Sequence, residues 1–275
     1  MPALGLGVGA IESEPGQAAA SVEAGLRVGF RLVDTAAVYG NEAEVAEGIA
    51  ASGVPRSEVF LTTKLWITDY GYDSALRAFD ASVARLRTDH VDLYLLHQPL
   101  PTDFDTTVAA YRACERLLAE GRVGAIGICN ASAAHLAALA ERTTVTPAVN
   151  QVELHPYFAQ PELRRVHAAA GIVTQAWSPI GGVSSWGPQG GSRPGPLADP
   201  VVLGIAAELG RTPAQVLLRW HLQRGDAAVT KSFRAERVRE NHDVFGFELG
   251  PQHVTAIDAL DTGVRGGRDP ETVTR

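Results

Sequence analysis

Residues 32–40 read LVDTAAVYG, and this stretch sets the pattern by which we interpret the rest of the chain. A short apolar run ends at the carboxylate of Asp34, and Tyr39 follows five residues later beside a glycine, just before a helix-like segment. The pattern predicts a buried strand that ends at Asp34, with Tyr39 on the loop after it. A phenol has a pKa near ~10 in water, so Tyr39 can donate a proton at neutral pH only beside a group that stabilises the phenolate.

The same unit, a short apolar strand followed by a helix, recurs along the chain. The predicted strands cover residues 3–9, 31–36, 59–64, 91–97, 123–130, 148–153, 172–178 and 227–232. The predicted helices cover residues 14–29, 41–52, 73–86, 106–120, 132–142, 161–170, 199–224 and 234–241. Asn41 and Glu44 have the spacing of a capping box, and we expect the segment 199–224 to be two helices, broken near Gly210 and Pro213.

Strands that are buried on both faces and separated by helices indicate a parallel sheet. Eight such units in about 250 residues fit a closed (β/α)8 TIM barrel, which we expect to form one domain over residues 1–275. The pattern alone does not exclude an open doubly wound sheet. The run GLGVGA at residues 5–10 loosely fits a dinucleotide fingerprint upstream of Asp34, but too few residues precede it to form the strand that a Rossmann unit needs.

Composition limits the function classes. The chain has 45% hydrophobic and 20% charged residues and a net charge of −7, which are typical of a soluble globular protein and argue against a nucleic-acid surface. Cys114 and Cys129 occur without a signal-peptide pattern, and no run approaches the ~20 apolar residues of a membrane span. We expect a cytoplasmic monomer with reduced thiols, no metal site and no membrane or nucleic-acid partner.

Lysine is rare in this chain. Of the 24 basic residues only Lys64 and Lys231 are lysines, and the others are arginines. One interpretation is that these two positions need a compact ammonium with an adjustable pKa, and the other is that two lysines survive by chance.

The ends of the predicted strands supply the candidate site, because active sites of (β/α)8 barrels lie at the carboxyl ends of the strands. Seven consecutive strands end in polar or hydrogen-bonding residues: Asp34 with Tyr39, Lys64, His97, Asn130, Asn150 with Gln151, Trp177 with Ser178, and Lys231 with Ser232. Singly, each has a structural explanation. Together at one barrel mouth, Lys64 would lower the pKa of Tyr39, Asp34 would hold the ammonium, and His97 would orient a substrate oxygen.

Several motifs carry a resemblance to a known family. They are DTAAVYGNE at 34–42, TKLW at 63–66, VDLYLLHQP at 91–99, GICN at 127–130, NQVELHP at 150–156, WSP at 177–179, and KS followed by an Arg-x-x-x-Asn pattern within 231–241. Nearly end to end, the chain resembles the aldo-keto reductase family, and within it the members similar to bacterial 2,5-diketo-D-gluconate reductases.

The resemblance implies roles for individual residues. It implies reduction of a small or sugar-type carbonyl substrate by hydride transfer from NADPH, with Tyr39 as general acid in a tetrad with Asp34, Lys64 and His97. The implied cofactor contacts are Asn130 and Gln151 at the carboxamide, Trp177 and Ser178 at the nicotinamide, Lys231, Ser232 and Arg237 at the 2′-phosphate, and Asn241 at the adenine. Two cations and a hydroxyl suit a phosphate dianion, which favours NADP(H) over NAD(H).

The chain departs from the family pattern at several positions. Cys129 replaces a serine, Gln98 replaces a frequent tryptophan and makes the substrate wall more polar, and Trp177 replaces a tyrosine. Val8 and Gly9 replace a common Thr-Trp pair. The hairpin that usually closes the barrel bottom has no counterpart, so we expect either a longer natural start or another cover.

The run GGVSSWGPQGGSRPGPLADP at residues 181–200 is rich in glycine, proline and serine. It could be a linker, but a domain boundary there would divide the barrel, so we expect a lid-like loop over the cofactor. With Gln98, Trp66 and Trp186 are candidate substrate contacts, and ordinary packing is the alternative for both tryptophans.

Two other functions fit a barrel with these residues. A Schiff-base lyase would use Lys64 or Lys231 as its nucleophile. A nucleotide-sensing regulatory subunit would keep the fold and the cofactor site without turnover.

Overall fold

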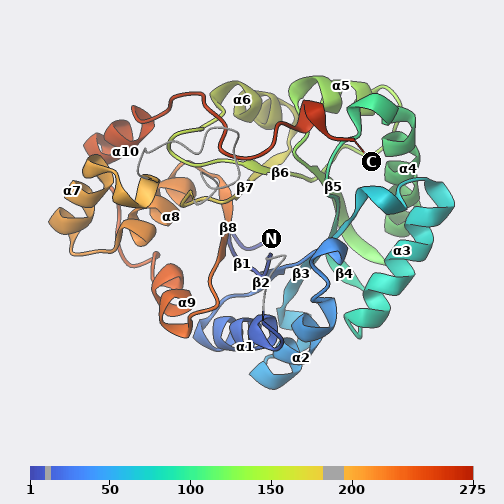
Figure 1. The fold of residues 1–275 in the computed structure, drawn as a ribbon, viewed down its shortest axis with the longest axis horizontal. Coiled ribbons are helices and arrows are strands. Elements are labelled where there is room, and N and C mark those ends of the chain that lie inside the picture. Colours follow the sequence, from blue (N-terminus) through green and yellow to red (C-terminus); the bar gives the residue numbers. More distant parts are fainter. Residues whose placement is uncertain (10–13, 182–194, 275) are drawn as a thin grey trace.

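A closed barrel of parallel strands forms the centre of the molecule, with helices around it (Figure 1). The computed structural model describes residues 1–9, 14–181 and 195–274. The strands are β1 (Leu4–Gly7), β2 (Leu32–Asp34), β3 (Phe60–Leu65), β4 (Val91–Leu96), β5 (Val123–Cys129), β6 (Val149–Glu153), β7 (Val173–Trp177) and β8 (Ala227–Lys231). They pair in sequence order and β8 closes on β1, which confirms the predicted (β/α)8 barrel and excludes the open sheet.

Helices follow the strands on the outside of this barrel (Figure 1). They are α1 (Gln17–Val28), α2 (Glu42–Ser52), α3 (Tyr72–Arg85), α4 (Phe104–Ala119), α5 (Ala133–Ala140), α6 (Pro161–Ala170), α7 (Pro200–Leu209), α8 (Pro213–Gln223), α9 (Ala235–His242) and α10 (Pro251–Asp258). Helix α10 was not expected from the sequence, because this helix lies after the last strand–helix unit. The run at 5–10 is no Rossmann turn, since β1 is a barrel strand between β2 and β8.

The predicted break between α7 and α8 is confirmed. The first helix ends at Gly210, which has φ 61°, and Thr212 caps the second by accepting the backbone N–H of Gln215. Within the described ranges no single helix is long and apolar enough to cross a membrane; α7 and α8 meet that test only as a pair, across a bend of 93°.

The predicted capping box at the start of α2 is wrong. Asn41 stands at the N-cap position, but its buried side chain donates to the Val8 carbonyl at 2.9 Å and accepts from the Thr35 hydroxyl at 2.8 Å. Glu44 instead accepts the backbone N–H of Ala18 at 3.0 Å. Asn41 satisfies polar groups between β1 and β2, where leaving them unpaired would cost more than a helix cap provides.

Residues of β4 alternate between the inside and the outside of the barrel. Tyr94 packs edge-on against Phe79 of α3, with ring centroids 5.0 Å apart, and therefore faces the helices. Leu93 and Leu95 belong instead to a small cluster with Cys129. This alternation directs every second residue of a strand to the barrel axis, where the polar side chains of the site gather.

The amino-terminal residues lie inside the ring of strands in Figure 1, and Met1 Sδ comes within 4.0 Å of the Gln175 amide nitrogen. The first residue of the given sequence therefore lies close to Gln175 of β7. Most of the segment 181–200, expected as a lid, and Trp186 with it, lie outside the described residues.

Buried histidines make stability dependent on pH. Burial, followed by nearby arginines or other cations, lowers the pKa of His167 to about 4 and that of His221 to about 3. In the unfolded chain both titrate near ~6.5, so below that pH the unfolded state binds more protons. We predict that the free energy of unfolding falls by about 1.6 kcal/mol per histidine between pH 6.5 and pH 5, measured by urea denaturation. A His167→Gln variant should lose part of this slope, and an unchanged slope would contradict the assignment.

Candidate active site

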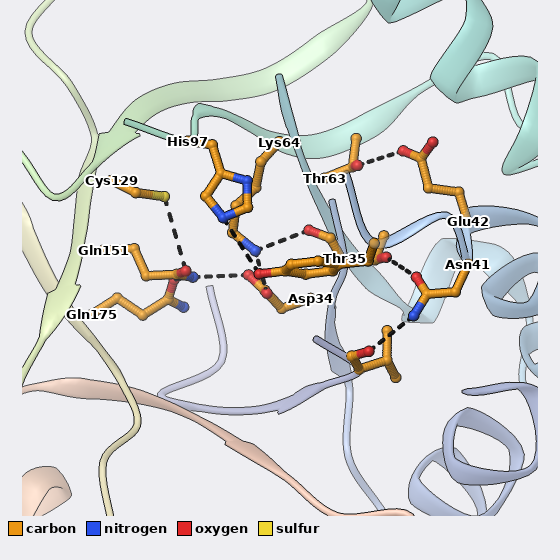
Figure 2. Close-up of polar contacts among 12 residues, drawn as sticks. Asp34, Thr35, Asn41, Glu42, Thr63, Lys64, His97, Cys129, Gln151 and Gln175 are labelled. Carbon is orange, nitrogen blue, oxygen red and sulfur yellow. Dashed lines mark hydrogen bonds and ion pairs between the residues drawn. The ribbon is translucent and has the colours of Figure 1, made fainter. Parts of the chain in front are cut away.

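A buried ion pair lies at the centre of the barrel mouth. Lys64, near the end of β3, donates from Nζ to Asp34 Oδ1 at 2.5 Å and to the Thr35 carbonyl at 2.9 Å. Figure 2 shows both carboxylate oxygens of Asp34 in use, because Gln151 Nε2 donates to Oδ2 at 2.8 Å. The register of β2 and β3 pairs Asp34 with Thr62, which places the two charged residues at the same end of neighbouring strands.

Electrostatics keep the Lys64 side chain charged, although it is 0% exposed. Burial alone would lower the pKa of Lys64, but the carboxylate of Asp34, with the phenol of Tyr39 and the thiol of Cys129, raises it above the usual value of 10.5. A buried ammonium is stable only when a carboxylate is this close. The site therefore holds a permanent positive charge next to Tyr39.

Tyr39 ends a short 3-10 turn, η1 (Ala37–Tyr39), after β2. Its hydroxyl lies 3.4 Å from His97 Nε2, and Lys64 Nζ lies 5.3 Å from the centroid of its ring. Gly9 fits against the phenol, since a Cβ there would be 3.2 Å from the hydroxyl oxygen. The glycine at position 9, where the family commonly has a larger residue, thus leaves space for the Tyr39 ring.

The pKa of Tyr39 differs in direction from the sequence expectation. Burial raises the pKa of the phenol above 10.0, and the charge of Lys64 lowers it again only in part. The predicted influence of Lys64 is present, but burial outweighs it. Ionisation of the Tyr39 hydroxyl thus depends on a neighbouring positive charge, because a phenolate left alone in this pocket is strongly disfavoured.

His97, at the end of β4, is a neutral imidazole. Burial first and the charge of Lys64 second hold the pKa of His97 well below its usual value of 6.5. The ring lies edge-on to both Tyr39 and Trp66, with centroids 5.5 Å and 5.1 Å away. A neutral ring beside the phenol can hydrogen-bond a substrate oxygen without adding charge.

Asn130, Gln151 and Trp177 meet on the other wall of the mouth. Asn130 has φ 59°, in the left-handed region, donates to the His97 carbonyl at 3.1 Å and accepts from Trp177 Nε1 at 2.7 Å. The Cys129 thiol stands 3.9 Å from Gln151 Oε1, a weak contact where a serine would bond more strongly. The predicted carboxamide residues are therefore brought together, and the indole is tied to one of them.

The predicted phosphate and adenine residues follow β8. Ser232 Oγ accepts the backbone N–H of Arg234 at 3.1 Å, and the Asn241 amide donates to Thr230 Oγ1 at 3.1 Å. Lys231 is largely exposed, and its ammonium lies 4.1 Å from the centroid of the Phe233 ring. Partial burial of this ammonium lowers the pKa of Lys231. Arg237 is exposed on α9.

A cavity of about 550 Å³ connects these groups. Its lining includes Asp34, Tyr39, Trp66, His97, Gln98, Asn130, Gln151, Trp177, Ser178 and Lys231. Three of the predicted cofactor contacts are not among its lining residues: Ser232, Arg237 and Asn241. Gln98 Oε1 is buried without a hydrogen-bond partner within the described part of the chain, so a polar acceptor is available at this wall.

A second buried carboxylate supports the strands under the site. Glu42 accepts from Thr63 Oγ1 at 2.6 Å, as Figure 2 shows. It also accepts from Arg85 Nε at 2.7 Å. Thr63 directly precedes Lys64, so this network fixes the backbone that carries the ammonium. The motif residues Asn41 and Glu42 therefore contribute structure to the site rather than chemistry.

Gln175 of β7 is a further polar residue of the barrel interior that is not among the predicted site residues. Its Oε1 accepts from Gln151 Nε2 at 2.7 Å inside the barrel. The signal was available, since Gln175 stands two residues before Trp177 and therefore shares its face of the strand.

The fold and the site define an enzyme of the (β/α)8 class with a tyrosine–lysine–carboxylate centre at the mouth of its barrel. A model of the aldo/keto reductase family matches residues 3–262, and the chain belongs to this family. It is 51% identical over 275 residues to morphine 6-dehydrogenase of Pseudomonas putida, covering 99% of this chain and 92% of that protein. It is 50% identical over 272 residues to an aldo-keto reductase of Mycolicibacterium smegmatis, covering 99% and 94%.

The fold is also that of solved structures. A mutant of Gox0644 in complex with NADPH superposes with a TM-score of 0.89 at 40% identity, covering 100% of this chain and 95% of that one. At this identity and coverage, the agreement confirms the single-domain barrel of the family.

Replacing one partner of the central ion pair should destabilise the fold strongly, whereas replacing both partners should destabilise it only slightly. We predict that Lys64→Met lowers the free energy of unfolding by about 3 kcal/mol, because Asp34 stays buried without its counter-charge. The double variant with Asp34→Asn should recover most of that loss in urea denaturation. Arg87→Met is the matched control, since it breaks the exposed pair with Glu47 at 3.0 Å and should cost below ~1 kcal/mol. If Lys64→Met and Arg87→Met lowered the free energy of unfolding equally, this account would be contradicted.

Proposed function

We propose that this chain catalyses the reversible, NADPH-dependent reduction of small carbonyl or sugar-type substrates, with Tyr39 as the proton donor. The observation that carries the proposal is the buried Lys64–Asp34 pair at 2.5 Å beneath Tyr39, in a cavity that also holds His97 and Trp177. Membership in the family and the NADPH complex of the Gox0644 mutant support it.

Each side chain of the site has a separate role in the proposed reaction. When bound, the nicotinamide cofactor supplies the hydride. Tyr39 donates its hydroxyl proton to the carbonyl oxygen, and Lys64 stabilises the phenolate that remains. Asp34 fixes the ammonium, and the neutral His97 holds the substrate oxygen near the Tyr39 hydroxyl, 3.4 Å from its own Nε2.

The residues present suit NADPH. Asn130 and Gln151 offer amide groups for the carboxamide, and Trp177 offers an aromatic face for the nicotinamide ring next to Ser178. Lys231, Ser232 and Arg237 supply two cations and a hydroxyl for the 2′-phosphate, and Asn241 an amide for the adenine.

The substrate is proposed only by class. The unpartnered Gln98 Oε1 favours carbonyl compounds that carry a hydroxyl group, and Trp66 adds an apolar face. Because one relative is named morphine 6-dehydrogenase, a screen of sugars, α-dicarbonyls and aromatic aldehydes should include morphine with NADP⁺. The likeness to 2,5-diketo-D-gluconate reductases stays a prediction, as do monomeric state and cytoplasmic location, which gel filtration and cell fractionation test.

A Schiff-base mechanism is disfavoured at Lys64. Such a nucleophile needs a neutral amine, whereas Lys64 is charged and bonded to Asp34 and to the Thr35 carbonyl. Trapping with borohydride in the presence of carbonyl substrates should give no adduct. Tight NADPH binding without turnover on the whole screen would instead support the regulatory role.

The role of Tyr39 gives a direct test. We predict that Tyr39→Phe keeps the dissociation constant of NADPH within about threefold but lowers kcat by at least ~10³-fold, because proton donation is lost while the cavity keeps its shape. Fluorescence titration measures binding, and the fall in absorbance of NADPH measures turnover. Tyr72→Phe, on the surface in α3, is the control and should behave as the unchanged chain. Near-normal turnover in Tyr39→Phe would overturn the mechanism.

The coenzyme preference tests the phosphate residues. Arg237→Gln should raise the dissociation constant of NADPH about tenfold and leave that of NADH unchanged, since a charge-assisted bond to a phosphate is worth about 1.5 kcal/mol. Arg239→Gln is the matched control, because it removes the same charge from the same helix. Equal effects of both replacements would show a general charge effect rather than recognition by Arg237.

A further inference from the structure

The amide of Gln151 occupies a position between two polar neighbours inside the barrel. Its two N–H groups are both used, one on Asp34 Oδ2 at 2.8 Å and one on Gln175 Oε1 at 2.7 Å. A primary amide has only two such donors. The carbonyl oxygen of Gln151, whose protein contact is the Cys129 thiol at 3.9 Å, is therefore the group left to accept a strong hydrogen bond.

The orientation of this amide follows from chemistry. Asp34 is an ionised carboxylate paired with Lys64, and a carboxylate accepts but does not donate. Rotating the amide by half a turn would place its oxygen against the Asp34 carboxylate and against Gln175 Oε1. Two acceptors thus hold the N–H side in place.

Gln175 is buried in the middle of β7, with an exposed fraction of 0%, and pairs in register with Gln151 of β6. Among the residues that the structure describes, its Nε2 contacts only the thioether of Met1, at 4.0 Å, which is a weak acceptor. Its one strong side-chain bond in the described structure goes to Gln151, as Figure 2 shows. Burying an amide in a barrel core costs free energy unless the amide is hydrogen-bonded. The bond to Gln151 is therefore the contact that offsets the cost of burying Gln175.

We propose that Gln175 is a positioning residue, which fixes the Gln151 amide so that its nitrogen holds Asp34 while its oxygen faces the cofactor carboxamide. This inference rests on the proposed NADPH-dependent function. Gln175 acts through Gln151 and does not line the cavity itself. One glutamine then couples cofactor binding to the carboxylate that holds Lys64.

The test compares two cofactors that differ in one donor. NADPH carries a carboxamide, whereas reduced 3-acetylpyridine adenine dinucleotide phosphate carries an acetyl group without N–H. The original chain should bind NADPH the more tightly, because only the carboxamide can donate to the Gln151 oxygen. In Gln175→Met, which has similar volume but no oxygen acceptor, we expect this ratio of dissociation constants to fall about tenfold, the worth of one well-placed hydrogen bond. Quenching of tryptophan fluorescence measures binding without turnover.

Further variants separate positioning from general damage. Gln175→Glu keeps an oxygen acceptor and should restore most of the ratio, and Gln175→Leu is a second acceptor-free variant in case the methionine variant does not fold. Tyr111→Phe removes another buried hydrogen bond, to the Val145 carbonyl at 3.1 Å, and should lower Tm without changing the ratio.

The outcomes distinguish the inference from the function on which it rests. If the original chain binds NADPH and discriminates against the acetyl analogue, but folded Gln175→Met and Gln175→Leu keep the full ratio, Gln175 has no positioning role. If the original chain neither binds NADPH nor reduces any carbonyl compound, the proposed function itself fails.

Discussion

The ion pair between Lys64 and Asp34 is the interaction on which the rest of the site depends. Removing two charges from water costs several kcal/mol each, and only a close pair with further hydrogen bonds offsets that cost. Here Nζ and Oδ1 are 2.5 Å apart, with the Thr35 carbonyl and the Gln151 amide on the remaining positions. Such proximity requires β2 and β3 to be neighbouring parallel strands with their carboxyl ends at the same edge of the sheet, and a closed parallel barrel meets this requirement.

One charge pair sets the properties of its neighbours in different ways. The ammonium helps to keep His97 neutral and offsets part of the burial cost of a Tyr39 phenolate. The carboxylate fixes the direction of the Gln151 amide through its second oxygen. In the proposed mechanism, proton donation, substrate orientation and cofactor contact are therefore not independent functions of separate residues, since each depends on the same buried pair.

Much of this site could be predicted from sequence because the carboxyl ends of parallel strands converge at one edge, so polar residues at strand ends meet in space. The predictions that were wrong or incomplete concern properties that depend on burial. Asn41 and Glu44 have the spacing of a capping box, but the buried Asn41 amide bonds to the Val8 carbonyl after β1 and the Thr35 hydroxyl after β2. The raised pKa of Tyr39 follows from burial, which the sequence does not show. Gln175 lies two residues before the end of its strand, and the prediction considered only the polar residues at the strand ends. The helix α10 lies after the last repeat, whose periodicity guided the rest.

The closure of the barrel has a consequence for how activity arises as the chain folds. Asp34 and Tyr39 follow the second strand, while Gln175 and Lys231 belong to the last two, and β8 must insert between β7 and β1 to complete the ring. Pairs so distant along the chain form late in folding, since the entropy of closing long loops must be overcome first. A partly synthesised or partly folded chain therefore has the lysine and the carboxylate but no complete active-site cavity. We expect catalytic competence only once β8 has paired with β1.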